Sequence, residues 1–551
     1  MLALAGEAHL RARQFTQAAE LFQNAAALRP DAAGLHTGLA LSSLGTGENG
    51  RAVAELERAA SLDKGTQRAG ILLTMSYLRA RAPDKAMAAV VQMEKNGSNP
   101  LVQNLKGGVH LAKQDLAGAR ASFEEALKLD PLYMPALDNL AQLDTMEKRP
   151  GGARQRYMAA LARSPGNPLL MEALARLAAA EGKTGEARQW LARALNDNPD
   201  DLRAGLRLVE FDVRAGDKQK ALVLAQKIQT SHPANVDARA MLAHVSYAND
   251  NFAAAAEEYA RLTAMSPNNA GLHARYATVQ MSMEDMAGAE ASLRKALSIA
   301  PDMTAAQLSL LNVLIAQKKF PAALSYAKTV QEKQPASASG FKYEGDVHGA
   351  QGMHAAAVKA YERAFVLQQS SALVTQLHGA LTRAGKAGEA KARITGWLGQ
   401  HPGDIATRMY FASGLLLAKD VEAGAEHLHA VLRFDPANVM ALNDLAWASQ
   451  QLKRKDALSY AERAYKLAPN NAAVLDTLGW ILMDNGETRR ALPLLKNASA
   501  LAPGSSDIRF HYGAALAKSG DKRSARAEIE RAMAGTSFTH KAEAKALLAT
   551  L

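Results

Sequence analysis

Alanine recurs at a fixed interval along this 551-residue chain. Successive alanine slots are 34 residues apart, with three intervals of 33, and the one slot that lacks alanine holds Gly424. A period of this length is typical of stacked helical hairpins, in which each repeat supplies one hairpin. The recurring residues are Ala18, Ala52, Ala86, Ala119, Ala153, Ala187, Ala221, Ala255, Ala289, Ala323, Ala357, Ala390, Ala457, Ala491 and Ala525.

Two other positions keep step with the alanine slot. A small residue stands about twelve residues before it, and a large apolar or aromatic residue stands four residues after it. Spacings of three and four place residues on one face of a helix, so we expect two helices per repeat that approach closely at the small residues. The small residues are Gly6, Ala40, Gly107, Ala141, Ala175, Ala243, Ala277, Gly345, Ala412, Ala446, Gly479 and Gly513. The large residues are Phe22, Leu56, Val90, Phe123, Tyr157, Leu191, Tyr259, Leu293, Tyr361, Ile394, Leu428, Leu495 and Ile529.

Proline and glycine mark the ends of the expected helices. Proline cannot continue a helix, so it separates one repeat from the next, and a following Asp or Asn can cap the next helix. The separating prolines are Pro30, Pro131, Pro165, Pro199, Pro233, Pro267, Pro301, Pro335, Pro402, Pro436, Pro469 and Pro503. Glycine is expected at the turn inside a hairpin, as at Gly182, Gly216, Gly352, Gly385, Gly486 and Gly520.

This set of positions resembles the tetratricopeptide repeat. The resemblance implies an all-α solenoid, a right-handed superhelix of about sixteen antiparallel helix pairs. The first helix of each pair, helix A, is expected to line an inner groove, and the second, helix B, to lie outside it. We expect a continuous array over residues 1–536 and a C-terminal capping helix over residues 537–551. Gly424 is the expected weak point, because glycine inside a helix costs about 1 kcal/mol relative to alanine.

Charge and composition narrow the possible functions only slightly. The formal charge of +11 is a mild excess for this length and indicates an ordinary solvated surface. Cysteine is absent, which excludes disulfides and thiol chemistry. No apolar run is long enough to span a membrane. The first residues, MLALAGEAHLRARQF, have the pattern of a repeat helix rather than a leader, so we expect the natural protein to start upstream of Met1.

No motif in the chain indicates catalysis, a cofactor or a metal. The segment from Gly45 to Gly50 matches the dinucleotide fingerprint, but it follows a helix, whereas that mechanism needs a strand. His427 and His429 are two residues apart on an expected helix and so face different sides. The basic runs are short and lie in turns. We therefore predict no enzyme activity, no catalytic, cofactor-binding or metal-binding residue, and no nucleic-acid partner.

The candidate ligand-binding residues lie on helix A of the fourteenth and fifteenth repeats. Positions three before and one after the small residue should face the inner groove. These positions hold Asn443, Trp447, Asp476 and Trp480. Exposed tryptophan beside polar side chains is typical of a binding hot spot. The alternative is that both indoles pack between neighbouring A helices as core; Trp190 and Trp397 fall on B helices and are expected to be packing residues.

The corresponding positions elsewhere argue against one known mode of recognition. Chaperone adaptors with this repeat bind a C-terminal carboxylate through Lys, Asn and Arg on helix A. The positions here include Asn104, Glu172, Leu206, Ala240, Ala274, Leu308 and Lys342, and no three neighbouring repeats assemble such a set. A receptor for chaperone tails is therefore disfavoured.

Part of the C-terminal third supports a narrower resemblance. The phrases ALNDLAW, AYKLAPNN and VLDTLGWIL, within residues 437–503, resemble the tetratricopeptide lipoproteins of the PEP-CTERM/exosortase system of Gram-negative bacteria. This resemblance implies a lipid-anchored periplasmic protein that is encoded together with exopolysaccharide and exosortase genes. The lipobox cysteine of such lipoproteins is missing here, so anchoring would require residues upstream of Met1.

The sequence thus predicts a non-enzymatic scaffold in exopolysaccharide export or PEP-CTERM protein sorting. The expected partners are proteins in the concave groove, with polysaccharide as a second class of ligand. The expected location is periplasmic or envelope-associated. Three alternatives remain open: a scaffold of another polysaccharide-secretion system, a cytosolic adaptor or co-chaperone, and the regulatory array of a glycosyltransferase.

Overall fold

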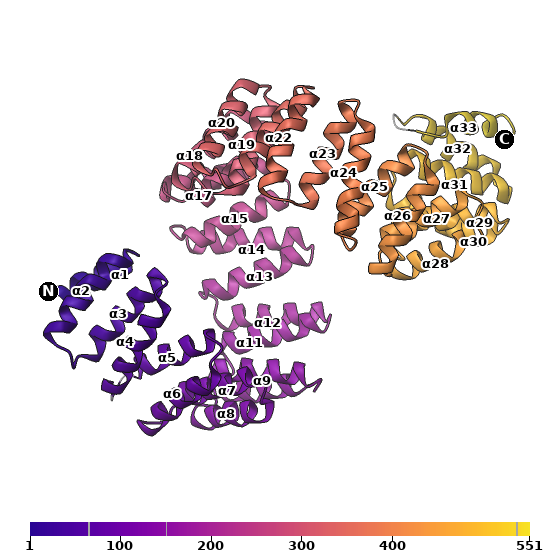
Figure 1. The fold of residues 1–551 in the computed structure, drawn as a ribbon. Helices are drawn as coiled ribbons and strands as arrows, with labels where there is room; N and C mark the ends of the chain where they lie inside the picture. Colours follow the sequence, from indigo (N-terminus) through magenta and orange to yellow (C-terminus); the bar gives the residue numbers. More distant parts are fainter. Residues whose placement is uncertain (64, 66, 150, 536–537) are drawn as a thin grey trace. The chain divides into compact units, whose positions relative to one another are not determined.

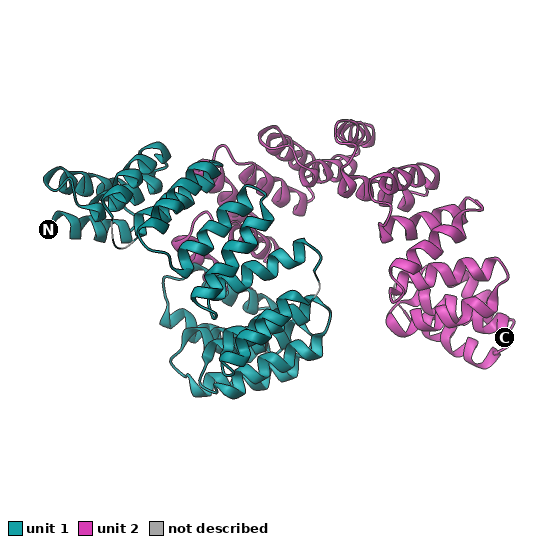
Figure 2. Cartoon of the chain, turned by 90° about the horizontal axis from the view of Figure 1, so that it is seen from below, with its two compact units in different colours: residues 1–285 teal, residues 286–551 magenta. Residues whose placement is uncertain are grey.

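The described part of the chain, in a computed structural model, is helical throughout and has no strand. It comprises residues 1–63, 65, 67–149, 151–535 and 538–551. The chain divides into two compact units, residues 1–285 (unit 1) and 286–551 (unit 2), which Figure 2 colours teal and magenta.

Unit 1 contains seventeen helices among its described residues (Figure 1). They are α1 (Leu2–Arg11), α2 (Phe15–Leu28), α3 (Ala33–Thr46), α4 (Asn49–Leu62), α5 (Arg68–Arg79), α6 (Pro83–Lys95), α7 (Pro100–Ala112), α8 (Leu116–Leu129), α9 (Met134–Met146), α10 (Gly152–Arg163), α11 (Pro168–Ala180), α12 (Thr184–Asp197), α13 (Leu202–Arg214), α14 (Lys218–Ser231), α15 (Val236–Ala248), α16 (Phe252–Met265) and α17 (Ala270–Ser282).

Unit 2 contains sixteen helices among its described residues. They are α18 (Met286–Ile299), α19 (Thr304–Ala316), α20 (Phe320–Lys333), α21 (Ser339–Ala350), α22 (His354–Leu367), α23 (Ser371–Arg383), α24 (Ala387–Gln400), α25 (Ile405–Leu417), α26 (Val421–Phe434), α27 (Val439–Gln451), α28 (Ala457–Leu467), α29 (Ala472–Asp484), α30 (Thr488–Leu501), α31 (Ser506–Ser519), α32 (Lys522–Met533) and α33 (Lys541–Leu548).

The described helices follow the predicted order, in which sixteen pairs of one A helix and one B helix are followed by one more helix. Odd-numbered helices up to α31 are A helices and even-numbered helices are B helices. Within each unit every helix packs on the next, and A helices also contact the A helix of the following repeat, as α13 does with α15 and α27 with α29. The prediction of an all-α solenoid of helical hairpins is confirmed. The predicted division at residues 536 and 537 lies outside the described residues, and the single continuous array stays a prediction.

The last helix covers apolar side chains at the end of unit 2. Leu547 and Leu548 of α33 pack on a cluster that includes Phe510, Ile529 and Phe538. Without α33 this apolar face of α31 and α32 would meet water. The helix therefore does what the sequence predicts for a cap.

The alanine slots form the line along which the two helices of a hairpin meet. All fifteen alanines are buried, and none exposes more than 7% of its surface. The small residue on helix A meets the large residue that follows the alanine on helix B. A Cβ atom added to Gly107, for example, would lie 2.4 Å from Cε1 of Phe123. The periodic pattern thus encodes the close approach of helix A to helix B in each hairpin.

The space beside Gly424, the expected weak point, is filled by a neighbouring side chain. A Cβ atom added there would lie 2.5 Å from Cδ2 and 2.9 Å from Cγ of Leu416. The Leu416 side chain of α25 occupies the space that an alanine methyl fills in the other repeats. Leu416 therefore packs against this glycine, and the expected weakening of helix α26 by glycine stays a prediction.

In the part of the chain that the structure describes, every turn from helix A to helix B contains a residue with left-handed backbone conformation. All six glycines predicted for these turns have positive φ, and so does Gly47, within the glycine-rich segment from Gly45 to Gly50. The other nine turns use residues with a side chain: Arg13, Arg81, Gln114, Lys148, Asp250, Glu284, Lys318, Lys419 and Lys453. The turn geometry is therefore constant, while the residue that adopts it is not.

A recurrent side chain ties helix A to the preceding repeat. In several repeats the residue sixteen positions before the alanine slot donates to the carbonyl of a proline six residues earlier. Arg239 donates to Pro233 over 2.9 Å, and Gln307 donates to Pro301 over 2.7 Å. The same arrangement joins Arg408 to Pro402 and Arg509 to Pro503. The accepting prolines lie in the turns that follow the B helices, so these bonds join helix A to the end of the preceding repeat.

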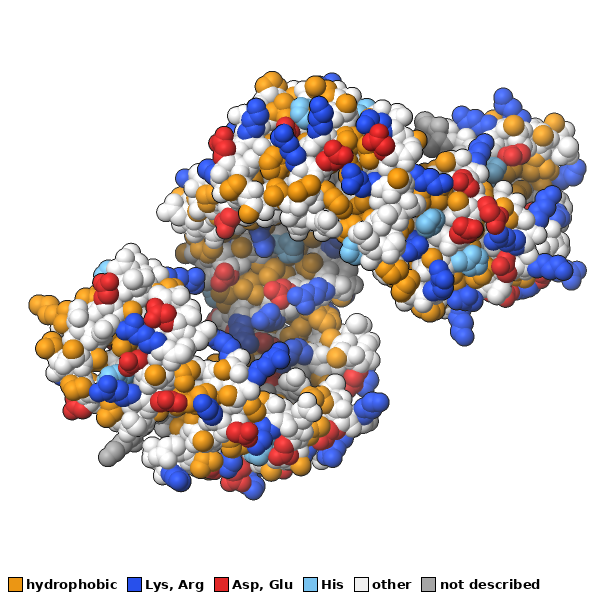
Figure 3. Space-filling model, viewed as in Figure 1, with side chains coloured by type: hydrophobic (Ala, Val, Ile, Leu, Met, Phe, Trp, Pro, Cys, Tyr) orange, Lys and Arg blue, Asp and Glu red, His pale blue; other side chains and the backbone are white. Residues whose placement is uncertain are grey.

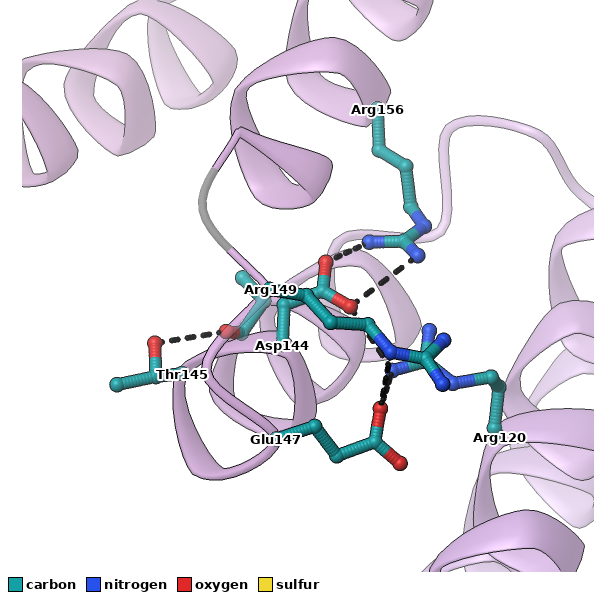
Figure 4. Close-up of polar contacts among 7 residues, drawn as sticks. Arg120, Asp144, Thr145, Glu147, Arg149 and Arg156 are labelled. Atoms are coloured by element: carbon teal, nitrogen blue, oxygen red, sulfur yellow. Dashed lines mark hydrogen bonds and ion pairs between the residues drawn. The ribbon is translucent and has the colours of Figure 1, made fainter.

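Buried ion pairs join successive repeats in unit 1. Figure 4 shows Arg120 of α8 and Arg156 of α10 converging on Asp144 of α9. Arg120 also lies 2.7 Å from Glu147, which in turn pairs with Arg149 at 3.0 Å. Burial acts to raise the pKa of Asp144, but the hydrogen bonds from the two arginines outweigh it and lower that pKa below its usual value.

Candidate partner-binding surface

The A helices present the positions that the sequence analysis assigns to the inner groove. We call this set of positions the inner face of each unit. Over the side visible in Figure 3, acidic, basic and apolar side chains are interspersed rather than segregated by charge. The two candidate tryptophans belong to the inner face of unit 2.

Trp447 lies on α27 as an exposed aromatic side chain. It exposes 39% of its surface, and Met440, two turns earlier on the same helix, exposes 64%. Residues seven positions apart lie on the same side of a helix, so the two form one exposed apolar strip. Asn443 lies between them in sequence and is half-buried. An exposed strip of this kind is a candidate contact for a partner.

The hydrogen-bonding groups of the Asn443 side chain are only partly paired. Its Nδ2 donates to Oδ1 of Asp444 over a long 3.4 Å, and its Oδ1 is buried without a hydrogen-bond partner. Burial raises the pKa of Asp444, with the Asn443 contact acting in the opposite direction. The two polar side chains beside Trp447 therefore keep unused hydrogen-bonding capacity.

Trp480 lies on α29 in a different environment. Its ring stacks on His511 of α31, with ring centres 4.1 Å apart and planes 24° apart, and it also contacts Phe510. The Nδ1 of His511 donates to the Asp476 carboxylate, at 2.9 Å from Oδ1 and 3.0 Å from Oδ2. Asp476, Trp480 and His511 thus form one packed cluster, and this indole is largely a packing group.

The different exposure of the two tryptophans follows from the next A helix. Phe510 and His511, on α31, stand at the positions that cover Trp480. The equivalent residues one repeat earlier, on α29, are Asp476 and Thr477. These side chains are too small to cover an indole, so Trp447 stays exposed. The structure therefore brings Asp476 and Trp480 together through His511, and no ring contact joins Trp447 to Trp480 in the described chain.

His511 is the residue of this cluster that sequence reasoning missed. It follows Asp476 by 35 residues, one more than the repeat period, and both stand on A helices. That spacing was the available signal, because residues about one period apart lie on neighbouring helices of the same kind.

Unit 1 has a groove on its own inner face. The groove lies between α13, α15 and α17 and has a volume of about 500 Å³. Leu206 and Met241 supply apolar wall, and Glu210, His244 and Arg275 supply polar groups. Burial and then Arg275 lower the pKa of His244, while Glu210 acts to raise it. The groove is thus amphipathic and within the size range of ligand sites.

Three of the seven positions named for a carboxylate clamp hold polar side chains, and all three contact other side chains of the chain. Asn104 accepts from Asn139 over 2.9 Å, and Glu172 lies 3.1 Å from Arg203. Lys342 donates to Asp346 over 2.7 Å. These contacts occupy the groups that a clamp would turn toward a ligand.

The other residues considered for chemistry have structural neighbours. His427 packs on Phe411 and His429 packs on Tyr460, so the two imidazoles face different helices. Within the described ranges no group of three His, Asp or Glu side chains is placed to hold a metal ion. Trp397 of α24 is buried, as predicted for a packing residue, and its Nε1 donates to Asp404. Among the described helices, none combines the length and apolar character needed to cross a bilayer.

The fold and this surface define the class of the molecule as a helical-repeat solenoid. Models of the tetratricopeptide repeat match residues 144–209 and 482–551, and residues 4–67 and 73–133. A model of a tetratricopeptide repeat-like domain matches residues 268–381. Together these segments cover more than half of the chain, which is a tetratricopeptide-repeat protein. Proteins of this class are generally scaffolds for protein interaction and typically non-catalytic.

Individual relatives are distant. The TPR repeat-containing protein PA4667 of Pseudomonas aeruginosa is 29% identical over 120 residues, which is 21% of this chain and 20% of that protein. Two solved structures align along almost all of the chain at 15% identity. The structure of Naa15/Naa10 bound to HypK-THB has a TM-score of 0.35 and covers 100% of this chain and 96% of that one. The APC/C hetero-tetramer Cut9-Hcn1 has a TM-score of 0.28, with 94% and 96% covered.

Proposed function

We propose that this protein is a non-enzymatic scaffold that binds protein partners on the inner faces of its two units. The observation that carries the proposal is the exposed strip of Trp447 and Met440 on helix α27. Burying a tryptophan of this kind at an interface removes a large apolar area from water, and tryptophan is enriched among residues that dominate binding energy. The amphipathic groove between α13, α15 and α17 offers unit 1 a comparable surface.

The proposed setting is the bacterial cell envelope, in exopolysaccharide export or the sorting of PEP-CTERM proteins. Its support is the resemblance of residues 437–503 to the tetratricopeptide lipoproteins of that system. The same segment contains Asn443, Trp447, Asp476 and Trp480, so the part of the chain that carries the resemblance also carries the candidate surface. Polysaccharide is the second class of ligand that we propose for this setting.

Binding is tested with Trp447→Ala and Met440→Ala, and Leu501→Ala is the matched control. Leu501 exposes 53% of its surface but lies on α30, a B helix. Each full-length variant is purified from its source cells, and the proteins that accompany it are quantified by mass spectrometry. We expect a defined set of proteins to be lost with the two α27 variants and retained with the control. Equal recovery from all three variants would refute binding at this strip.

The setting is tested by cell fractionation with mapping of the native N-terminus. A periplasmic or membrane-bound protein with a lipid-modified cysteine upstream of residue 1 is the expected result. Recovery in the cytosolic fraction would overturn the envelope proposal and favour a cytosolic adaptor. That outcome would not affect the scaffold proposal, because the first experiment measures partner binding and the second measures cellular location.

A further inference from the structure

Three arginines share one register position in the repeats, sixteen residues before the alanine slot. They are Arg239, Arg408 and Arg509. Each donates to the proline carbonyl six residues earlier, over 2.9, 3.1 and 2.8 Å respectively. The three side chains are therefore held in the same way at one end, and they differ in what they meet on helix B.

Two of these arginines have a carboxylate partner nineteen residues later. Arg239 pairs with Glu258, and Arg509 pairs with Glu528, whose Oε2 lies 2.7 Å from Nη1. In the repeat of α25 and α26 the equivalent residue is His427. The Nη1 of Arg408 lies 3.4 Å from Nδ1 of His427, and no carboxylate of the described chain lies within ion-pair distance of Arg408.

Two more cations, Arg433 and Lys391, act on this pair through their charge. Burial and then Arg433 lower the pKa of Arg408, while Asp404 raises it. Burial and then Arg408 lower the pKa of His427, with Lys391 adding to this effect and Glu426 opposing it. Burial is the larger cause of both pKa shifts, and the neighbouring cations act in the same direction.

The nearby carboxylate of Asp404 is already engaged. Its Oδ2 accepts from Ser371 at 2.6 Å, from Trp397 at 2.6 Å and from the Thr407 hydroxyl at 2.7 Å. Its Oδ1 accepts from the backbone N–H of Thr407 at 3.1 Å, as the N-cap of α25. Asp404 therefore caps the helix and holds the neighbouring side chains, instead of pairing with Arg408.

We propose that Arg408, together with His427, Lys391 and Arg433, forms an anion-binding site that takes a single oxyanion group, a carboxylate or a phosphate, of a ligand. The group would sit where Glu258 and Glu528 place their carboxylates in the other two repeats. A planar guanidinium matches the two oxygens of such a group. Lys391 and Arg433 are exposed at this site, and Arg408 and His427 are half-buried, so the site is open to solvent.

The charge balance of unit 2 agrees with this assignment. Residues 286–551 contain 32 Lys and Arg against 23 Asp and Glu, whereas residues 1–285 contain 33 against 31. The positive charge of the chain is thus concentrated in the unit that holds the cluster, which favours the approach of anions. The site does not involve Trp447 or Met440, and the inference does not rest on the proposed scaffold function.

The test is a calorimetric titration of the full chain with sodium phosphate and, separately, with sodium acetate, at constant ionic strength set with sodium chloride. We expect saturable binding of at least one of the two anions. His427→Glu restores the pairing used by Arg239 and Arg509, and it should weaken binding at least tenfold because its own carboxylate fills the site. Arg408→Met should weaken binding to a similar extent. Saturation by phosphate alone or acetate alone identifies which oxyanion the site accepts.

Arg509→Met is the matched control, since it removes an arginine of the same register whose charge Glu528 already balances. It should leave the affinity within a factor of two of the wild type. Helical circular dichroism verifies the fold of each variant, and His427→Glu remains decisive if Arg408→Met fails to fold. Absence of saturable binding by the wild type, unchanged binding by His427→Glu, or equal weakening by Arg509→Met would each overturn the site.

Discussion

Arg188 of α12 and Asp212 of α13 form a two-point ion pair between successive repeats. Nε lies 2.7 Å from Oδ1, and Nη2 lies 2.9 Å from Oδ2. The Asp212 side chain is fully buried, whereas Arg188 exposes 36% of its side chain. Arg120 and Asp144 stand at the same register positions two repeats earlier and also pair. The repeat period therefore fixes polar contacts between repeats as well as apolar ones.

Replacing Arg188 and replacing Asp212 should lower the stability of the hairpins by different amounts. Arg188→Met leaves a buried carboxylate without its cation, which we expect to cost about 3 kcal/mol. Asp212→Asn leaves Arg188 able to turn toward water and should cost less. Hydrogen exchange of α12 and α13 measures the local effect, because a solenoid need not unfold as one cooperative unit. Equal losses in the two variants would show that burial of Asp212 does not govern the pair.

The turns between helices A and B allow a test of backbone strain. Lys318 has φ +57° and Gly352 has φ +75° at equivalent turns of unit 2. Left-handed backbone is unfavourable for a residue with a side chain, by about 1–2 kcal/mol. Lys318→Gly should therefore raise the stability of its hairpin by about 1 kcal/mol, and Gly352→Lys should lower it by a similar amount. Thermal unfolding followed by circular dichroism checks both signs.

Replacing two helical glycines by alanine should change the stability of the protein in opposite directions. An added Cβ at Gly396 of α24 meets nothing within 4 Å, so Gly396→Ala should stabilise by about 0.5–1 kcal/mol through helix propensity. At Gly424 the added methyl meets Leu416, and overpacking of about 1–3 kcal/mol should exceed that gain. The midpoint of chemical denaturation distinguishes them. A rise for both variants would show that Leu416 moves aside freely.

Asp404 should make unit 2 sensitive to acid. Burial alone would raise its pKa, but hydrogen bonds from Ser371, Trp397 and Thr407 outweigh burial and lower the pKa from 3.8 to about 2. Because the folded pKa lies below the unfolded one, the stabilisation is complete above about pH 4 and is lost as pH falls toward 2. Its size is about 2 kcal/mol. Melting temperatures of the wild type should fall more steeply over this range than those of Asp404→Asn.

Much of the fold was predictable because it depends on spacing. The interval between alanines requires only that small residues recur where helices touch, and all fifteen alanines are buried as expected. The turn at Lys318 was not predictable in the same way, because left-handed backbone there needs no particular side chain. The repeat pattern could not show that Leu416, from the other helix of the hairpin, fills the space of the missing methyl at Gly424.

The candidate site was predictable only as a set of positions. Trp447 and Trp480 are equivalent in the repeat, yet one is exposed and the other is stacked on His511. The difference arises from residues of the next A helix, Asp476 and Thr477 in one case, Phe510 and His511 in the other. A pattern that treats all repeats alike cannot distinguish these two environments. The envelope setting depends on resemblance alone and stays a prediction.

Site-specific photo-cross-linking tests the central claim, that the inner face binds a protein partner, most directly. A photoreactive amino acid replaces Trp447 in one full-length variant and Leu501, which is similarly exposed on B helix α30, in another. After irradiation of the source cells, we predict a discrete cross-linked protein from position 447 and none from position 501. Identical cross-linking patterns from the two positions, or none from position 447, would contradict the account.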